Sequence, residues 1–216
     1  MSITEDKSME LLKRTKAALE KNNMISYIVS DKAEAKKLCE ELLKEGATVS
    51  SGGSMTLAEC EVTKLLRSGR YNYIDRENYE DKRQAYLESF FADYYLCSSN
   101  AVTENGELYN VDGNGNRVAA ICYGPSNVIL LVGKNKIVKD ITEAEKRVKK
   151  TAAPLNCRRL SCETYCNTKG ECMGVSGDMP SGCASDSRIC CQYVVTGFQR
   201  IKNRITVILI NEDCGF

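Results

Sequence analysis

The chain has 216 residues, of which 43% are hydrophobic and 27% charged, and its formal net charge is +1. This balance is typical of a globular protein with enough apolar residues for its own core, and it excludes bulk electrostatic attraction to nucleic acid or membranes. The chain contains no histidine, which excludes Ser-His and Cys-His nucleophile pairs and histidine-liganded metals.

The first 22 residues are charged throughout and lack the apolar stretch of a signal peptide. The longest aliphatic run, 128–132, is too short to cross a bilayer. We therefore expect a cytoplasmic protein with no nucleic-acid or membrane partner. In that compartment thiols stay reduced, so clustered cysteines more often bind metal than form disulfides.

Helical and strand patterns alternate through the first 150 residues. Apolar residues at helical spacing predict a helix over 5–22. Asp31 and Glu34 begin a second helix, which Gly46 ends. We expect strands at 24–29, 47–51, 71–75, 94–99, 101–103, 107–111 and 127–133. The last of these is continuously apolar, which indicates a central strand buried on both faces.

Three more helices are predicted after the second strand. Thr56 and Glu59 form a capping-box pattern that opens a helix ending near Arg67. Residues 78–91 are predicted to form the next helix. Four of its side chains should face the core: Tyr86, Leu87, Phe90 and Phe91. Thr142 and Glu145 open the last helix, which runs to about Ala152 and is stopped by Pro154.

Strands separated by helices predict an α/β fold with a mostly parallel sheet and helices on both faces. We interpret residues 1–216 as a single domain. A cysteine-rich segment, 155–191, interrupts the alternation, and the strands at 192–198 and 204–210 that follow it are expected to form an antiparallel pair.

Seven of the twelve cysteines lie in the segment that begins at Cys157 and ends at Cys191. The segment has no apolar stripe, so burial of its own side chains cannot offset the entropy of ordering it, about 1–2 kcal/mol per residue. Four thiolates on a metal would supply on the order of 10 kcal/mol, and thiolates favour zinc or an iron–sulfur cluster. A disulfide-rich or disordered loop is the alternative. The cysteines outside the segment at 39, 60, 97 and 122 fit apolar core positions.

Two polar turns are candidate ligand sites. Gly52, Gly53, Ser54 and Thr56 join a strand to a helix, where amide groups and hydroxyls would bind a phosphate or carboxylate; a simple helix cap is the alternative. The chain has neither a Walker A nor a G-x-G-x-x-G pattern, so no nucleotide is implied.

The second candidate begins at Glu104, which precedes an Asn-Gly turn and would act as a carboxylate nucleophile or base. A further polar turn follows, containing Asp112, Asn114, Asn116 and Arg117. In an open α/β sheet such strand ends surround the ligand crevice. A hairpin turn without catalytic function is the alternative for Glu104.

Three segments, "GGSMTL", "SSNAVTENGELYNVDGNGNRVAAICYGPSNVILLVGKNKIV" and "RITVILINEDCGF", resemble the lactate-utilisation (LUD, LutC-like) domain family. The similarity is closest to stand-alone members from anaerobic bacteria. It implies a Rossmann-like fold of the sugar-isomerase and CoA-transferase superfamily and a role linked to L-lactate oxidation to pyruvate. Thr103 to Gly106 also resembles the S-E-N-G motif that carries the CoA-transferase nucleophile, with threonine in place of serine.

The resemblance extends to the cysteine segment. It implies four metal ligands at Cys166, Cys172, Cys183 and Cys190. A longer gap between the second and third leaves the set open, since Cys162 or Cys191 could substitute. The electron-moving pathway favours an iron–sulfur cluster, with Zn²⁺ as the alternative.

We therefore expect an accessory redox or metabolic protein with a four-thiolate site, an electron-transfer protein partner and a small anionic metabolite. A transferase or hydrolase of CoA esters or phosphosugars that uses Glu104 is one alternative. A non-catalytic module that docks through the cysteine segment is another.

Overall fold

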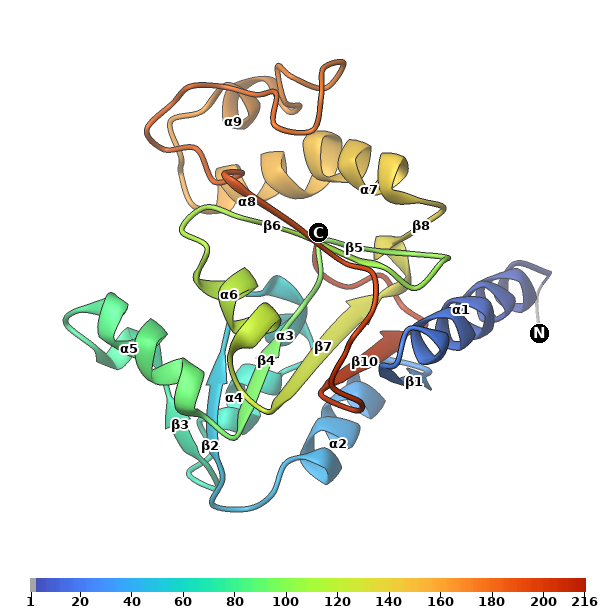
Figure 1. The fold of residues 1–216 in the computed structure, drawn as a ribbon, viewed down its shortest axis with the longest axis vertical. Coiled ribbons are helices and arrows are strands. Elements are labelled where there is room, and N and C mark those ends of the chain that lie inside the picture. Colours follow the sequence, from blue (N-terminus) through green and yellow to red (C-terminus); the bar gives the residue numbers. More distant parts are fainter. Residues whose placement is uncertain (1–2) are drawn as a thin grey trace.

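The computed structural model describes residues 3–216 (Figure 1). The longer helices are α1 (Ile3–Lys21), α2 (Lys32–Leu42), α5 (Lys82–Glu88), α6 (Asn116–Tyr123), α7 (Ile141–Arg147) and α8 (Ala153–Arg159). Short helical turns are α3 (Met55–Glu59), α4 (Val62–Leu66), η1 (Arg76–Asn78), η2 (Ser89–Phe91), η3 (Lys134–Lys136), η4 (Val148–Ala152) and α9 (Tyr165–Lys169). The strands are β1 (Ile25–Val29), β2 (Thr48–Ser51), β3 (Asn72–Ile74), β4 (Tyr94–Cys97), β5 (Ala101–Thr103), β6 (Leu108–Asp112), β7 (Asn127–Gly133), β8 (Ile137–Val138), β9 (Gln192–Thr196) and β10 (Ile205–Ile210).

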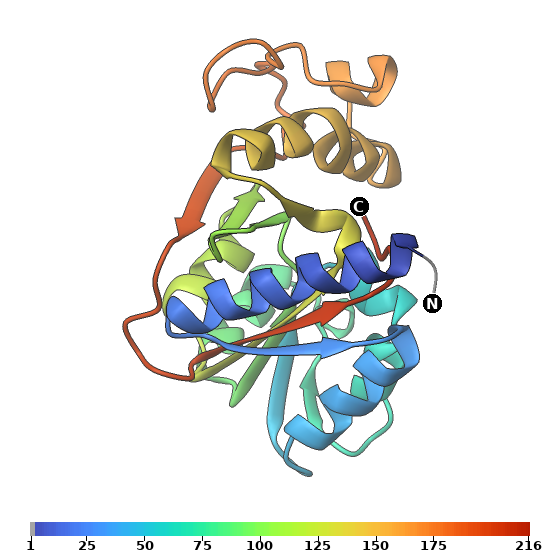
Figure 2. The same cartoon turned by 90° about the vertical axis from the view of Figure 1, so that its right-hand side faces the viewer.

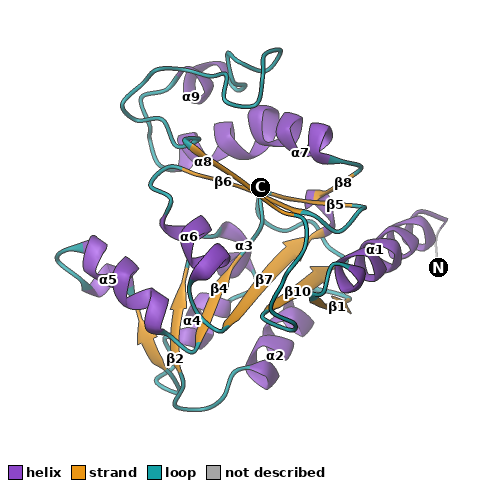
Figure 3. Ribbon diagram, in the orientation of Figure 1, coloured by secondary structure: helices purple, strands orange, loops and turns teal. Residues whose placement is uncertain are grey.

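The larger sheet has six strands in the order β1-β10-β7-β4-β2-β3, and all of its neighbouring strands run parallel (Figure 3). The predicted α/β class and mostly parallel sheet are therefore confirmed. Strand β7 lies between β10 and β4 and is buried from Val128 to Gly133, as its uninterrupted apolar run predicted.

Each face of this sheet has its own apolar core. Helices α2, α3 and α4 pack on one face, where Cys39, Leu57 and Leu66 are buried with Leu131 of β7. Helices α1 and α6 cover the other face with Leu12, Leu19 and Ile121. Burying each of these leucine and isoleucine side chains contributes about 1.5–3 kcal/mol.

A second sheet has four strands in the order β8-β5-β6-β9 and lies between the larger sheet and the cysteine segment (Figure 1). The chain enters it directly from β4 through Ser98, Ser99 and Asn100. The prediction that 192–198 and 204–210 pair with each other is wrong. Strand β9 pairs antiparallel with β6, whereas β10 is inserted in parallel between β1 and β7. Because β10 is apolar at every position but Thr206 and is buried throughout, the core of the larger sheet accommodates it better than an edge would.

The helix expected from Thr56 to Arg67 is two short helices that begin one residue earlier. Ser54 is the N-cap of α3, and its Oγ accepts a hydrogen bond from the Leu57 amide. Glu61 has a left-handed backbone, with φ of 55°, and separates α3 from α4. The capping-box prediction is wrong because the Thr56 hydroxyl is buried and bonds to other groups.

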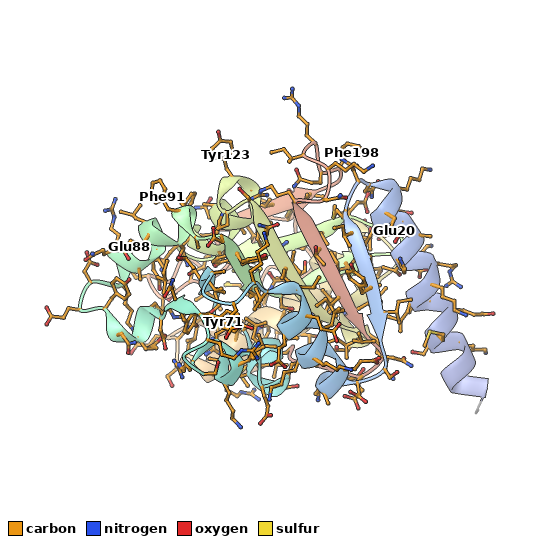
Figure 4. The ribbon with its side chains drawn as sticks, turned by 90° about the horizontal axis from the view of Figure 1, so that it is seen from below. Glu20, Tyr71, Glu88, Phe91, Tyr123 and Phe198 are labelled. Carbon is orange, nitrogen blue, oxygen red and sulfur yellow. The ribbon has the colours of Figure 1, made fainter. Side chains whose placement is uncertain are left out.

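The inward face predicted for residues 78–91 is also wrong in part. Leu87 is 50% exposed and Phe91 is 89% exposed, and Phe91 lies at the periphery of the molecule (Figure 4). Ala85 is instead the buried side chain of α5. The segment is a helix for seven residues only, and the change to the tighter η2 turn rotates its last residues away from the core.

Helix α7 does not end before Pro154 but continues through η4 and α8 to Arg159 (Figure 2). Turn η4 is a π-helix, in which the Ala153 amide bonds to the Val148 carbonyl five residues earlier. This wider turn accommodates the proline ring, and Pro154 then occupies the start of α8. The Cys-rich segment thus begins inside a helix that packs on the second sheet through Ala144, Val148 and Ala153.

Within residues 3–216, no helix is both long enough and apolar enough to span a membrane.

Candidate functional site

Five cysteines of the Cys-rich segment line a single small cavity. They are Cys157, Cys166, Cys172, Cys183 and Cys190. This set contains all four ligands that the family resemblance implied. It omits the two proposed substitutes, because Cys162 lines a different surface hollow and Cys191 is exposed. The cysteine cavity lies between the α7–η4–α8 helix and the segment above it (Figure 2).

Short local structures aim these cysteines at the cavity. Cys157 is on α8, and Cys166 follows Thr164, whose hydroxyl caps α9 by accepting the Asn167 amide. The Cys172 amide donates to the Lys149 carbonyl at 2.9 Å. In a π-helix each carbonyl accepts a hydrogen bond from the backbone amide five residues later. For the Lys149 carbonyl that residue is Pro154, whose nitrogen has no hydrogen to donate. The proline therefore leaves a helix carbonyl available to hold the cysteine segment.

Two basic side chains hold the rest of the segment by its carbonyl groups. Lys149 is buried, and its Nζ donates to the carbonyls of Gly174, Gly177 and Asp178 and to the Glu145 carboxylate. These contacts supply order that the sequence led us to expect from a bound metal, with disulfides or disorder as the alternatives. The absence of an apolar stripe was observed correctly, but long basic side chains can bind a loop through its backbone.

The second basic side chain, Arg188, ties two of the implied ligands together. It donates to the carbonyl of Cys190 at 2.9 Å and to that of Cys183 at 3.0 Å. It also donates to the Pro180 carbonyl and the Tyr193 hydroxyl. One guanidinium therefore fixes the spacing between the backbones of two cysteines.

The cysteine cavity contains an unmatched donor, the hydroxyl of Tyr109. Tyr109 is fully buried, lines the cavity, and its hydroxyl has no hydrogen-bond partner among the described residues. Burial, and after it the neighbouring Glu145, raises the pKa of this hydroxyl, so it is a neutral donor. A buried hydroxyl without a partner costs free energy, so a sulfur acceptor inside the cavity would satisfy it.

The spacing of the thiols bears on which metal group fits. Among the side chains that the structure describes, residues 7–216, no three of Cys, Asp or Glu are close enough together to hold a single ion. A tetrahedral zinc site with bonds of about 2.3 Å would bring its sulfurs to about 3.8 Å from one another. In a [4Fe–4S] cluster each cysteine binds a different iron, whereas in a [2Fe–2S] cluster two cysteines bind each iron. A lining that contains five cysteines has the donor type that zinc and both kinds of cluster take.

Burial controls the protonation of the cavity thiols. Burial raises the pKa of Cys157 to about 12 and also raises the pKa of Cys172, while the Gly174 amide, 3.4 Å from the Cys172 Sγ, acts in the opposite direction. Both side chains are therefore neutral thiols in the metal-free protein. A metal group would displace their protons, as thiolate ligation requires.

A second, polar cleft of about 240 Å³ opens where the carboxyl ends of β2, β4 and β7 meet the second sheet. It collects most of the predicted anion-site residues, namely Gly53, Ser54, Asn114, Asn116 and Arg117. Gly52 and Thr56 lie directly behind it. A Cβ on Gly52 would approach the Tyr95 hydroxyl to 2.9 Å, and the Thr56 hydroxyl bonds to Lys136. The two turns, about 60 residues apart in sequence, are thus brought together.

Lys136 is the central cation of the polar cleft, and the sequence analysis missed it. It is 3% exposed, and its Nζ bonds to Thr56 Oγ1 at 2.8 Å and to Ser98 Oγ at 3.0 Å. Burial, together with the nearby charge of Arg147, lowers its pKa to about 8. The only sequence signal was a polar turn, GKNK, directly after the central strand.

Arg117 shapes the polar cleft and leaves little capacity for a ligand. Its guanidinium donates to the side-chain oxygens of Asn100 and Asn110 and to the carbonyls of Ser98 and Val111. The Asp112 carboxylate in turn accepts a hydrogen bond from the Arg117 backbone amide in the first turn of α6. Arg117 is therefore a framework residue that holds the strand ends together.

The structure places Glu104 away from both hollows. Its carboxylate pairs with Arg14 of α1 at 3.1 Å, and it is not among the residues that line the polar cleft or the cysteine cavity. The Asn-Gly turn that follows serves to dock α1. Gly106 has φ of 80°, a Cβ there would lie 2.5 Å from the Ala18 backbone, and Asn22 donates to the Asn105 carbonyl. This geometry supports the hairpin-turn alternative. Glu104, the residue at the position of the nucleophile in the S-E-N-G motif, does not line the polar cleft or the cysteine cavity.

Comparison with known proteins identifies the family of this chain. A family model described as the LUD domain matches residues 12–210. The chain belongs to the LUD domain family. This membership confirms the family predicted from the sequence and gives the protein a general lactate-utilisation-like role.

One solved LUD-related structure supports the fold. A crystal structure of a DUF162 family protein from Deinococcus radiodurans is similar with a TM-score of 0.55 and 16% identity, over 94% of this chain and 98% of that one. The eIF2B beta structure from Chaetomium thermophilum is similar over 54% of this chain and 42% of that one, with 18% identity and a TM-score of 0.37. No curated protein sequence matches the chain.

Proposed function

We propose that this LUD protein is an accessory redox protein of lactate-type utilisation, with an iron–sulfur cluster held in the cysteine cavity. The observation that carries the proposal is the convergence of five cysteines on one cavity. Cys166, Cys172, Cys183 and Cys190 would be the ligands, with Cys157 next to them. When bound, such a cluster supplies one-electron transfer.

The surrounding residues prepare the cavity for this group. Lys149 and Arg188 fix the backbone that carries three of the ligands. The Gly174 amide donates to the Cys172 sulfur, and the unpartnered Tyr109 hydroxyl would donate to a sulfur of the bound cluster; hydrogen bonds to sulfur tune the reduction potential of a cluster. We place the protein in the cytoplasm, where these thiols stay reduced until metal is inserted.

Anaerobic purification tests the proposal directly. We expect about four irons and four acid-labile sulfides per chain, with broad visible absorption that bleaches on reduction. Cys166→Ser should lower the iron content severalfold. Cys191→Ser is the matched control, because this exposed cysteine lies outside the cavity lining, and it should retain iron. About one zinc per chain would replace the cluster with a structural site, and neither metal would remove the cofactor from the proposal.

A second candidate function is docking to an electron-transfer protein through the cysteine segment. Two large apolar side chains of this segment line the cavity and are exposed: Tyr165 at 44% and Met173 at 58%. Exposed methionine and tyrosine are enriched at protein interfaces. Reduction of the iron-loaded protein by a ferredoxin, compared between the native chain and Met173→Lys, tests this role. Equal reduction rates would count against docking at this surface.

A further inference from the structure

Lys136 is a buried cation with only neutral partners. Its ammonium contacts the hydroxyls of Thr56 and Ser98, and among the described side chains, residues 7–216, no carboxylate forms an ion pair with it. A lysine has three donors, and these two contacts use two of them. Burying a charge is costly unless an opposite charge compensates it. Glu59, whose carboxylate pairs with Lys32, compensates the Lys136 charge only from a distance. The unused donor and this incomplete compensation both point to an anionic ligand in the polar cleft.

The charge around the polar cleft favours the same conclusion. Four basic side chains line it, Arg117, Lys136, Arg159 and Arg188, against one acidic side chain, Asp112. The Asp112 carboxylate is already engaged by the amides of Arg117 and Val118. A hollow with this excess of positive charge attracts anions and raises their local concentration.

The basic side chains divide into framework and ligand groups. Arg117 and Arg188 spend most of their donors on carbonyl and amide oxygens. Arg159 is exposed at the mouth of the cleft, where its guanidinium bonds only to the neighbouring Asn156 side chain. Lys136 at the base and Arg159 at the mouth are therefore the cations that a ligand would meet.

We propose that the polar cleft binds a small oxyanion, a carboxylate or a phosphate, with Lys136 as its principal partner, and that Arg188 couples this binding to the cysteine cavity. The first half depends only on the cleft. The second half rests on the proposed function, because it requires a metal group in the cavity.

The coupling follows from the position of Arg188 and Ile189, which line both hollows. The Arg188 guanidinium is fixed by the carbonyls of Cys183 and Cys190. Metal ligation by these two cysteines would move their backbones, and the wall of the polar cleft would move with them. Linkage then requires that the oxyanion changes metal affinity by the same factor as the metal changes oxyanion affinity.

Isothermal titration tests the first half with three sodium salts, L-lactate, pyruvate and inorganic phosphate, in a chloride buffer of matched ionic strength. We expect saturable binding of at least one. Lys136→Met should weaken it about tenfold or more, because a charge-assisted hydrogen bond is lost. Lys139→Met, an exposed lysine three residues away, is the control and should bind normally. Preference for the carboxylates over phosphate identifies the ligand class, and the reverse preference assigns a phosphate.

Two results would overturn the cleft assignment. One is the absence of binding by all three salts at 10 mM, a concentration on the order of ten times the weak end of typical substrate affinities. The other is equal affinity in the native chain and Lys136→Met. Circular dichroism of the variant separates lost binding from lost folding.

The second half is tested by comparing iron-loaded and metal-free protein in the same titration. We expect the oxyanion affinity to differ at least threefold between them, and the difference to vanish in Arg188→Met. Equal affinities in the two forms refute the coupling. If the protein takes up no metal, both the proposed function and the coupling fail. Oxyanion binding that depends on Lys136 would still support the first half of the proposal, the anion site in the polar cleft.

Discussion

The burial of Lys136 predicts how the stability of the protein changes with pH. Its pKa falls from the ordinary value of 10.5 to about 8 in the folded chain. The folded pKa is therefore about 2.5 below the unfolded pKa. At about 1.36 kcal/mol for each pKa unit, this difference amounts to about 3 kcal/mol of folding free energy. Because Lys136 is 97% buried, with 3% of its surface exposed, solvent screens this effect little. Lys136→Met replaces the ammonium with an apolar group of similar length and should remove the effect.

The sign follows from proton binding. Between pH 8 and pH 10.5 the unfolded chain keeps a proton on Lys136 that the folded chain has lost. The free energy of unfolding of the native chain should therefore rise with pH through this window, by about 3 kcal/mol relative to Lys136→Met. Below pH 8 both states are protonated, and the variant should be the more stable of the two by up to this amount.

Urea unfolding of both proteins at pH 7.5, 8.5, 9.5 and 10.5, in chloride without added oxyanion, measures this difference. Other titrating groups are common to the two proteins and cancel in the comparison. Lys139→Met is the control and should follow the native chain. Parallel stability curves for the native chain and Lys136→Met would refute the assignment of a buried charge at this position.

Three further predictions concern the helix docking, the cysteine segment and the Glu104 turn. Gly106→Ala should destabilise the protein by more than about 1 kcal/mol and loosen α1, because the new Cβ would overlap the Ala18 backbone. Amide hydrogen exchange in α1 should become faster, and unchanged exchange would contradict the close contact between Gly106 and Ala18. Lys149→Met should leave three carbonyls without their donor and increase proteolysis within 172–178, whereas Lys150→Met, an exposed neighbour, should not; equal cleavage would show that Lys149 does not hold the segment. Glu104→Ala should cost only about 0.2–1 kcal/mol in thermal unfolding and leave oxyanion binding intact, since its ion pair with Arg14 is exposed; a large loss of binding would restore a role for Glu104 in the cleft.

Most of the larger sheet could be predicted from the sequence because its strands are short, apolar and separated by helices. Periodicity, however, carries no information on which strand pairs with which. Strand β10 follows β9 by nine residues, and a hairpin is the common outcome at that distance. The pairing is instead decided by burial, because β10 is apolar on both faces and β9 is not.

The candidate sites were predictable in proportion to how local their signals are. The cysteine cluster and the polar turns at 52–56 and 112–117 are visible as composition, and in the structure most of their residues line two hollows. Lys136 could not be predicted, because one lysine among many in the sequence gains its character only when the fold buries it. Pro154 misled the helix prediction since a proline normally ends a helix, and the wider η4 turn cannot be read from residue types.

The place of Pro154 in the long helix has a consequence for how the protein would be assembled. Because the Cys172 amide is anchored to the Lys149 carbonyl, at least one thiol is presented at the cavity wall before any cofactor arrives. A receptor that is shaped in advance loses less conformational freedom when it is filled. Maturation of this protein would then be insertion into a site that is already partly formed, and the metal-free chain should persist in the cell as a folded acceptor of the cofactor.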